Sequence, residues 1–189
     1  MRIKPLQPDI LSPEVRYVHD EIAGLIGRSQ GQVTMLNAAG ALLGPFPPML
    51  KYPQFGIPAL SFLRTLDTEA TLSKTVREVA ILTVGSAYGA RFELSVHEIM
   101  AEAFGLSPIT IATLAAGGHP PGLNEEENIA HIITRSLVNG RIVPDSAYKQ
   151  AVRVFGQDRV AELFFLIGGY TLIATILNGF DMPGPDTKD

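Results

Sequence analysis

The stretch SKTVREVAILTVGSAYGARFELSVHEIMAEAFG, residues 73–105, predicts two consecutive helices and holds most of the polar side chains that suggest chemistry. Ser73 is a typical N-cap for a helix over Lys74–Tyr88, and Gly89 is a typical residue after a helix end. A second helix follows over 91–104, again closed by a glycine.

The flanking sequence is helical in pattern, without the alternation or hairpin turns of strands. Ser12, Pro13 and Glu14 form a typical helix start. The further helical segments that we expect lie at about 15–26, 33–43, 59–66, 109–115, 125–139, 145–154 and 158–177. Prolines within 45–58 should keep that part free of helix. We predict an all-α single domain over 1–189 with about seven or eight helices, N-terminal helices in 1–43 and a flexible tail at 182–189.

The composition excludes several classes of protein. The 189 residues include no Cys, which rules out disulfides, thiolate metal sites and thiol nucleophiles. The mean hydropathy of +0.20 excludes a disordered chain. The formal net charge is −4 and the basic residues form no cluster, so we expect no nucleic-acid partner.

The charged fraction of 18% is low against a norm of about 25%, which predicts that some surface is covered in a homo-oligomer. No apolar signal region follows the N-terminus. The apolar run at 163–177 is shorter than the roughly 20 residues needed to span a bilayer. We therefore expect a cytoplasmic protein without a membrane segment, and a core or interface helix at this run.

Two Glu-x-x-x-His pairs stand out, because this spacing places both side chains on one helical face where they can share a hydrogen bond. Glu93 and His97 adjoin the apolar face of their helix, so we predict that they point inward, where burial shifts pKa values toward those that acid–base chemistry needs. Glu127 and His131 lie opposite the apolar face of theirs. We predict a solvated surface pair there.

Glu78 is the third candidate, because no charged residue follows it until the next helix. A lone acid near the start of a buried helix is either functional or a stabilising charge with a partner such as Arg77. His19 fits a hydrogen-bonded core histidine, and His119 a loop residue without a visible partner. Neither Glu-His pair has the spacing of a helical zinc site, so we expect no metal.

Several of these runs resemble the carboxymuconolactone decarboxylase family, which belongs with the alkylhydroperoxidase-D-like proteins. The matching runs are VREVAILTV at 76–84, RFELSVHE at 91–98, AFGLS at 103–107, IGGY at 167–170 and LNGFD at 177–181. The resemblance covers about 44–181. It implies an all-helical fold that assembles as dimers, trimers or hexamers.

In the peroxidase branch of this family the site is formed by a Glu, a Cys-x-x-Cys pair and a His. Here the resemblance assigns the Glu to Glu78 and the His to His97, whereas the cysteine positions hold Ala90 and Glu93. Dithiol peroxidase activity is therefore excluded. In the decarboxylase branch a carboxylate and a His act without a cofactor on a carboxylated lactone, and Glu93 and His97 fit that pattern.

The resulting hypothesis is a cofactor-free lyase for a small carboxylated or lactone-like substrate. His97 acts as acid or base, Glu93 orients it or exchanges protons with it, and Glu78 completes a relay. The apolar residues that we expect to line the pocket are Phe46, Tyr88, Met100 and Phe104.

Two alternatives stay open: another cofactor-free C–C lyase, isomerase or dehydratase on the same residues, or a non-catalytic ligand-binding oligomer. The sequence shows no anchor for an anionic substrate on the stripe of Glu93 and His97.

Overall fold

A computed structural model describes residues 1–28 and 35–185 of the chain. Within these residues it has nine α-helices, one short 3-10 helix and no β-strand, which confirms the all-α prediction. The elements are η1 (Pro8–Ile10), α1 (Pro13–Arg28), α2 (Phe46–Lys51), α3 (Pro53–Thr68), α4 (Lys74–Tyr88), α5 (Arg91–Ala103), α6 (Pro108–Ala115), α7 (Glu125–Val138), α8 (Asp145–Phe155) and α9 (Gln157–Gly179).

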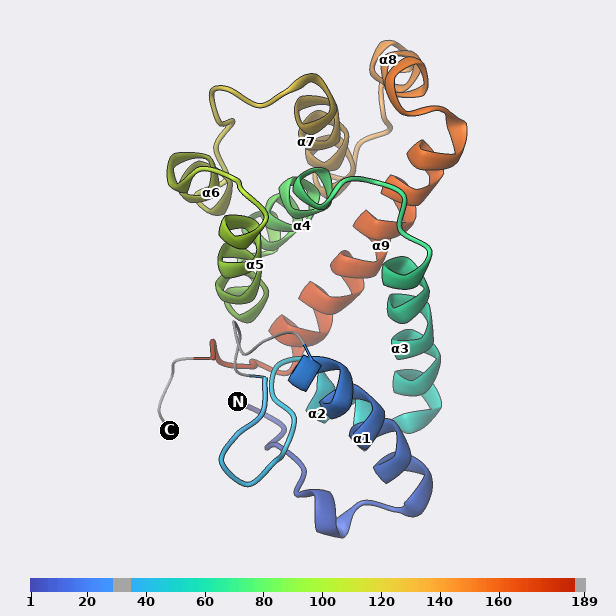
Figure 1. The fold of residues 1–189 in the computed structure, drawn as a ribbon, viewed down its shortest axis with the longest axis vertical. Helices are drawn as coiled ribbons and strands as arrows, with labels where there is room; N and C mark the ends of the chain where they lie inside the picture. Colours follow the sequence, from blue (N-terminus) through green and yellow to red (C-terminus); the bar gives the residue numbers. More distant parts are fainter. Residues whose placement is uncertain (29–34, 186–189) are drawn as a thin grey trace.

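Helix α4 is the central element, and it packs mainly against α5, α7 and α9 (Figure 1). Its ends follow the sequence signals: the side chain of Ser73 accepts the N–H of Val76, and Gly89 adopts the left-handed conformation at φ 61°. Every residue from Glu78 to Gly85 is buried. A helix buried on all sides explains why this segment has so few charges.

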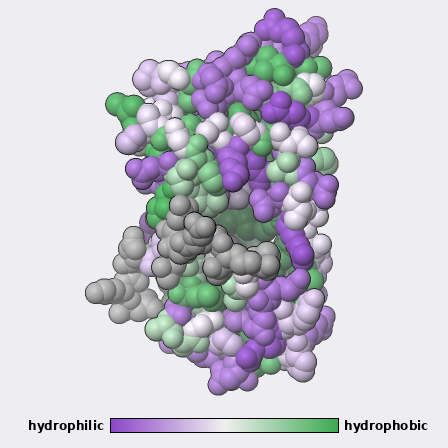
Figure 2. All heavy atoms as spheres, viewed as in Figure 1, coloured by the Kyte–Doolittle hydropathy of each residue, from purple (hydrophilic) through white to green (hydrophobic). Residues whose placement is uncertain are grey.

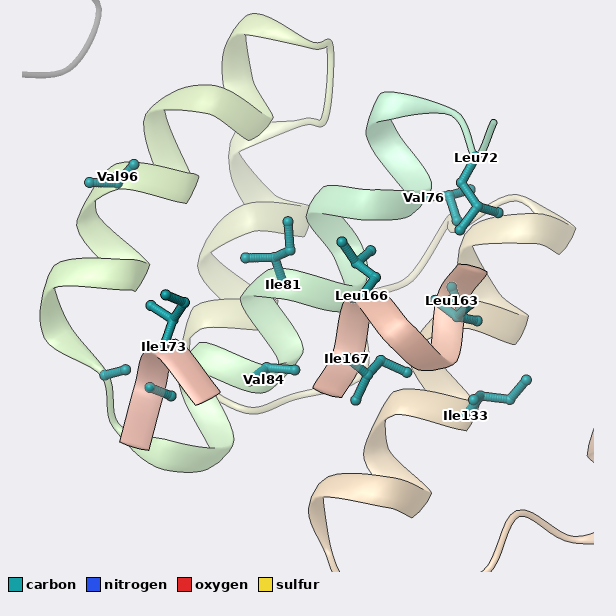
Figure 3. Packing of buried hydrophobic residues seen from close by; sticks show 14 of the residues in the cluster. Leu72, Val76, Ile81, Val84, Val96, Ile133, Leu163, Leu166, Ile167 and Ile173 are labelled. Atoms are coloured by element: carbon teal, nitrogen blue, oxygen red, sulfur yellow. The ribbon is translucent and has the colours of Figure 1, made fainter. Parts of the chain in front are cut away.

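Helix α9 runs along the molecule and forms the core with α4 (Figure 1). Its Leu163, Leu166, Ile167 and Ile173 gather with apolar side chains of α4 and α7, as Figure 3 shows. In the described part of the chain, α9 is also the single helix long and apolar enough to cross a membrane, by length and composition alone. Its packing against the core fits the predicted core helix.

The N-terminal part has less helix than predicted. Residues 35–43 form a turn closed by a bridge between Leu36 and Leu42, while 33–34 lie outside the described residues. The side chain of Asn37 accepts the N–H groups of Ala39 and Ala41, so it competes with a helix for the backbone. The region 1–43 therefore holds one α-helix and one 3-10 turn among its described residues.

The proline-rich part has more helix than predicted. Pro47 and Pro48 lie in the first turn of α2, and Pro53 begins α3. The N–H groups of a first turn have no partner within the helix, so proline costs little there. Within the described residues, Pro58 lies in a helix beyond the first turn, and α3 continues through it. The other predicted helices match within about two residues, and of the predicted tail, 186–189 lie outside the described residues.

Candidate active site

A cavity of about 360 Å³ lies between α3, α5 and α9. The space-filling view shows a hollow with hydrophobic side chains at this place (Figure 2). Its apolar wall includes Leu60 and Leu63 of α3, Val96 of α5, and Ile173 and Leu177 of α9. Polar side chains also line it: Arg64, Asp67, Thr68, Arg77, Glu93, His97 and Tyr170. The arrangement is that of a binding site, which is typically a concave apolar pocket with a few placed polar groups.

His97 and Glu78 form a buried hydrogen-bonded pair at this cavity. Nδ1 of His97 on α5 lies 2.8 Å from Oε2 of Glu78 on α4, and the side chains of both are largely shielded from solvent. With the carboxylate as acceptor, Nδ1 carries the hydrogen and Nε2 is left to act on a bound molecule. The partner of this lone acid is therefore a histidine on the next helix.

Glu93 also lines the cavity, but it is not bonded to His97. Both of its carboxyl oxygens are buried without a hydrogen-bond partner among the described residues, so the predicted bond within the Glu-x-x-x-His pair is not made. Burial raises the pKa of Glu93 well above its usual range, which favours the neutral carboxyl. Gly85 of α4 makes room for this group, because a Cβ there would lie 3.3 Å from Oε1 of Glu93.

Tyr170 of α9 completes the polar wall, and the sequence reasoning did not assign it to the site. Its ring meets that of His97 edge-on, with centroids 5.0 Å apart and an interplanar angle of 85°. Burial raises the pKa of the Tyr170 hydroxyl, and the negative charge of Glu78 adds to this, so the hydroxyl keeps its proton. A tyrosine in an apolar helix resembles a core residue, so no signal in the sequence pointed to it.

Two arginines at the cavity were also missed. Arg77 donates from Nη1 to the carbonyl of Leu66 over 2.7 Å and lies 3.6 Å from the carboxylate of Asp67. No bond between Arg77 and Glu78 occurs among the described contacts, so the predicted pairing of these neighbours is not made. Arg64 of α3 is more exposed and pairs with Glu21 of α1 over 3.0 Å. These are the cationic groups that the Glu93 and His97 stripe itself lacks.

Of the four apolar residues predicted to line the pocket, Phe46 does so. Tyr88, Met100 and Phe104 are not among the lining residues. Tyr88 is partly exposed at the end of α4, Met100 packs on the core, and the ring of Phe104 lies under the ammonium of Lys74 at 4.6 Å. Met100 and Phe104 continue the helical stripe of Glu93 and His97, but neither of them lines the cavity.

The second Glu-His pair is buried, which corrects the prediction of a solvated surface pair. Glu127 is 7% exposed and its carboxylate accepts the N–H of Asn124 in a capping box. His131 is 1% exposed, and its Nδ1 lies 3.0 Å from Oγ1 of Thr83. That hydroxyl donates to the carbonyl of Val79, so Nδ1 of His131 must be the donor of the shared bond.

The two remaining histidines are His119 and His19. The ring of His119 lies 4.9 Å from that of His131, so this loop residue has a partner after all. His19 is buried and its ring nitrogens contact Asp20 and the carbonyl of Gly40. His19 is thus a buried, hydrogen-bonded histidine. Within the described residues no three His, Asp or Glu side chains are grouped closely enough to hold a metal ion.

Solved structures of other proteins are similar to this chain and identify its fold. No protein-family model and no curated protein sequence matches the chain. A peroxidase-related protein of Ralstonia eutropha with an AhpD core is similar in structure, at a TM-score of 0.73 and 13% identity over 98% of this chain and 92% of that one. The debrominase Bmp8, as a cysteine-to-alanine variant in complex with 2,3,4-tribromopyrrole, gives a TM-score of 0.73 at 14% identity over 97% and 91%.

A third similar structure is a protein of unknown function from Agrobacterium tumefaciens, to which an AhpD role in antioxidant defence has been suggested. Its TM-score is 0.63 at 15% identity, covering 71% of this chain and 93% of that one. At these identities the likeness concerns the fold. The chain has the AhpD-like helical fold, as the resemblance in the sequence implied.

Proposed function

We propose that the cavity is the active site of a cofactor-independent acid–base enzyme that acts on a small carboxylated lactone or a related carbonyl compound, as the decarboxylase branch does. The observation that carries this proposal is the buried pair of His97 and Glu78 at the wall of an apolar cavity. A base oriented by a carboxylate and shielded from water is the arrangement that proton transfer requires.

In this proposal Nε2 of His97 takes up or delivers the proton. Glu78 holds the ring in one tautomer, because its carboxylate accepts the hydrogen of Nδ1. The same carboxylate stabilises the imidazolium that forms when Nε2 is protonated. General acid–base catalysis of this kind contributes about 10²–10⁴-fold to the rate.

Arg77 is the group at the cavity that we propose as the anchor of an anionic substrate. It is held in place by the carbonyl of Leu66 and borders the cavity with a permanent positive charge, which the carboxylates of Asp67 at 3.6 Å and Glu162 at 3.7 Å offset in part. The rest of the wall is largely apolar, which suits the ring of a lactone or aromatic compound. A carboxylate at Arg77 would leave the body of the substrate against Leu60, Leu63 and Ile173.

The other reactions considered for the same residues, C–C lysis, isomerisation and dehydration, share this proton transfer and differ in the group that leaves. Debromination is the activity of one structural neighbour, which was studied as a cysteine variant. This chain contains no cysteine, so no thiol-dependent reaction is proposed for it. The alternative hypothesis, which the test must distinguish from this proposal, is a ligand-binding protein without catalytic activity.

The test is turnover of a panel of small carboxylated γ-lactones and β-keto acids in D₂O, followed by proton NMR. We expect loss of CO₂ from at least one compound, with deuterium placed on the carbon that loses it. His97→Gln should reduce that rate by about 10²–10⁴-fold. The matched control is His131→Gln, which removes the other buried imidazole next to α4 and should leave the rate within about threefold.

Binding without turnover across the panel would support the ligand-binding reading instead. Equal rates for wild type and the His97 variant would contradict the proposal, because the reaction would then use other groups. Circular dichroism and the Tm of each variant show that the fold is retained.

A further inference from the structure

We propose that Glu93 and Tyr170 together form a binding site for a developing enolate oxygen, in which a protonated carboxyl and a phenol hydroxyl each donate one hydrogen bond. This deepens the proposed function and rests on it for the source of the enolate. It assigns Glu93 to a role other than orienting His97, and it brings Tyr170 into the site.

The first argument is the pair of unused donors. Both carboxyl oxygens of Glu93 are buried without a partner among the described residues, although buried polar groups are almost always hydrogen-bonded. No described residue is hydrogen-bonded to the Tyr170 hydroxyl either. Both residues line the same cavity. A ligand that accepts hydrogen bonds would satisfy them.

The second argument is the charge state. Burial raises the pKa of Glu93 and of Tyr170, so both favour the form that carries a proton. A neutral carboxyl offers one O–H donor, and a phenol offers another. A neutral acid paired with a tyrosine is a known way to stabilise an enolate oxygen at neutral pH, because neither donor loses its proton to bulk water.

The third argument is position relative to the base. Tyr170 places its ring against the ring of His97, and Glu93 lies one helical turn before His97 on α5. Both proposed donors are therefore neighbours of His97 in the wall of one cavity. The apolar wall around them strengthens hydrogen bonds to a charged oxygen, since the local dielectric is low.

The chemistry balances without an added reagent. In proton abstraction the C–H bond next to the carbonyl breaks, its electron pair forms the enolate, and the proton goes to Nε2 of His97. In decarboxylation the bond to the carboxylate breaks instead, CO₂ leaves, and protonated His97 returns a proton to the carbon. In both cases the negative charge develops on the oxygen that Glu93 and Tyr170 hold.

The test uses 4-nitrophenol, whose phenolate resembles an enolate and absorbs visible light. We expect the wild-type protein to bind the phenolate more tightly than the phenol, so that the bound probe ionises at lower pH than the free probe. Tyr170→Phe and Glu93→Leu should each weaken phenolate binding by about 10-fold or more, since a hydrogen bond to a charged group is a strong one. Glu93→Gln keeps a donor and should retain part of the affinity.

Tyr148→Phe on α8 and Glu102→Gln on α5 are matched controls, because they make the same kinds of change away from the cavity. Unchanged phenolate affinity in both Tyr170→Phe and Glu93→Leu would overturn the inference, as would wild-type protein that does not bind the phenolate. If Glu93→Leu fails to fold, Tyr170→Phe decides alone, and unchanged phenolate affinity in that variant overturns the inference.

His97→Gln separates this inference from the proposed function. The inference expects this variant to bind the phenolate about as well as wild type while turnover is lost. Loss of phenolate binding in His97→Gln, with Tyr170→Phe and Glu93→Leu unaffected, would show that protonated His97 holds the anion and would overturn the inference. Retained turnover in His97→Gln would contradict the proposed function alone.

Discussion

The chain repeats one motif, Glu-x-x-x-His, on α5 and on α7, and the two copies have different surroundings. In both, the histidine is buried and its Nδ1 contacts α4 rather than the glutamate four residues earlier. On α5 the partner is the carboxylate of Glu78 and the ring borders a cavity of about 360 Å³. On α7 the partner is the hydroxyl of Thr83 and the ring lies against His119.

The comparison shows that the partner on α4, and not the motif, sets what each histidine can do. A carboxylate beside an imidazole stabilises its charged form, which is what the proton transfer proposed for His97 needs. A hydroxyl that already donates to a carbonyl offers no negative charge. Burial, His119 and Arg135 then lower the pKa of His131 to about 4. The first copy suits acid–base chemistry, and the second is a neutral packing residue.

The largest expected effect is the difference in turnover between the two histidines. On whichever lactone or keto acid reacts, His97→Gln should lower kcat by about 10³-fold, because the group that moves the proton is gone. His131→Gln should leave kcat within about threefold. Single-turnover kinetics on both variants give the ratio. Similar losses in the two variants would mean that His97 acts through the fold.

The next effect is acid sensitivity caused by His131. The unfolded chain binds a proton here below about pH 6.5, whereas the folded chain binds it only below about pH 4, so stability is lost as the pH falls through that window. The full loss is about 3 kcal/mol. Urea unfolding of wild type and His131→Gln at about pH 7 and about pH 4.5 should show the variant losing less stability. Parallel losses would show that other groups cause the acid sensitivity.

The two partners on α4 give a smaller contrast. Glu78→Gln should lower kcat by about 10–100-fold, because the amide neither fixes the tautomer of His97 nor stabilises its charged form. Thr83→Val should leave kcat nearly unchanged but cost about 1–3 kcal/mol of stability, since Nδ1–H of His131 loses its acceptor. Kinetics and thermal unfolding of both variants separate the two effects. A lower kcat in Thr83→Val would contradict this distinction between Glu78 and Thr83.

The smallest effect is expected at His119. His119→Ala removes a neighbouring positive charge and part of the cover over His131, so the pKa of His131 should rise toward its ordinary value. The stability lost at neutral pH should be about 0.5–1.5 kcal/mol, the range for an aromatic contact. NMR titration of the His131 ring measures the shift. An unchanged pKa would place the cause of the shift in burial and in the charge of Arg135.

Much of this arrangement could be predicted from local sequence. Ser73 and Gly89 marked the ends of α4, and the lack of charges after Glu78 indicated that the helix is buried. The apolar stripe of α5 correctly indicated that Glu93 and His97 are shielded. These features depend on one helix at a time, which is the range over which helical periodicity is informative.

The features that were missed depend on how helices meet. Helix α7 packs against both α4 and α8, so a face that looked polar on one helix is covered by another, and His131 becomes buried. The partner of His97 lies on α4, and Tyr170 and Arg64 reach the cavity from α9 and α3. No spacing within a single helix encodes such contacts. The oligomer predicted from the low charge fraction stays a prediction.

Gly85 has a consequence for how relatives of this chain should vary. A methyl group there would lie 3.0 Å from Cδ2 of Leu94 and 3.3 Å from Oε1 of Glu93, closer than most Cβ contacts. Because residue 85 has no side chain, there is space between α4 and α5 for the carboxyl group of Glu93. In an alignment of relatives we expect glycine at this position wherever glutamate stands at 93, and larger residues where a shorter side chain replaces it.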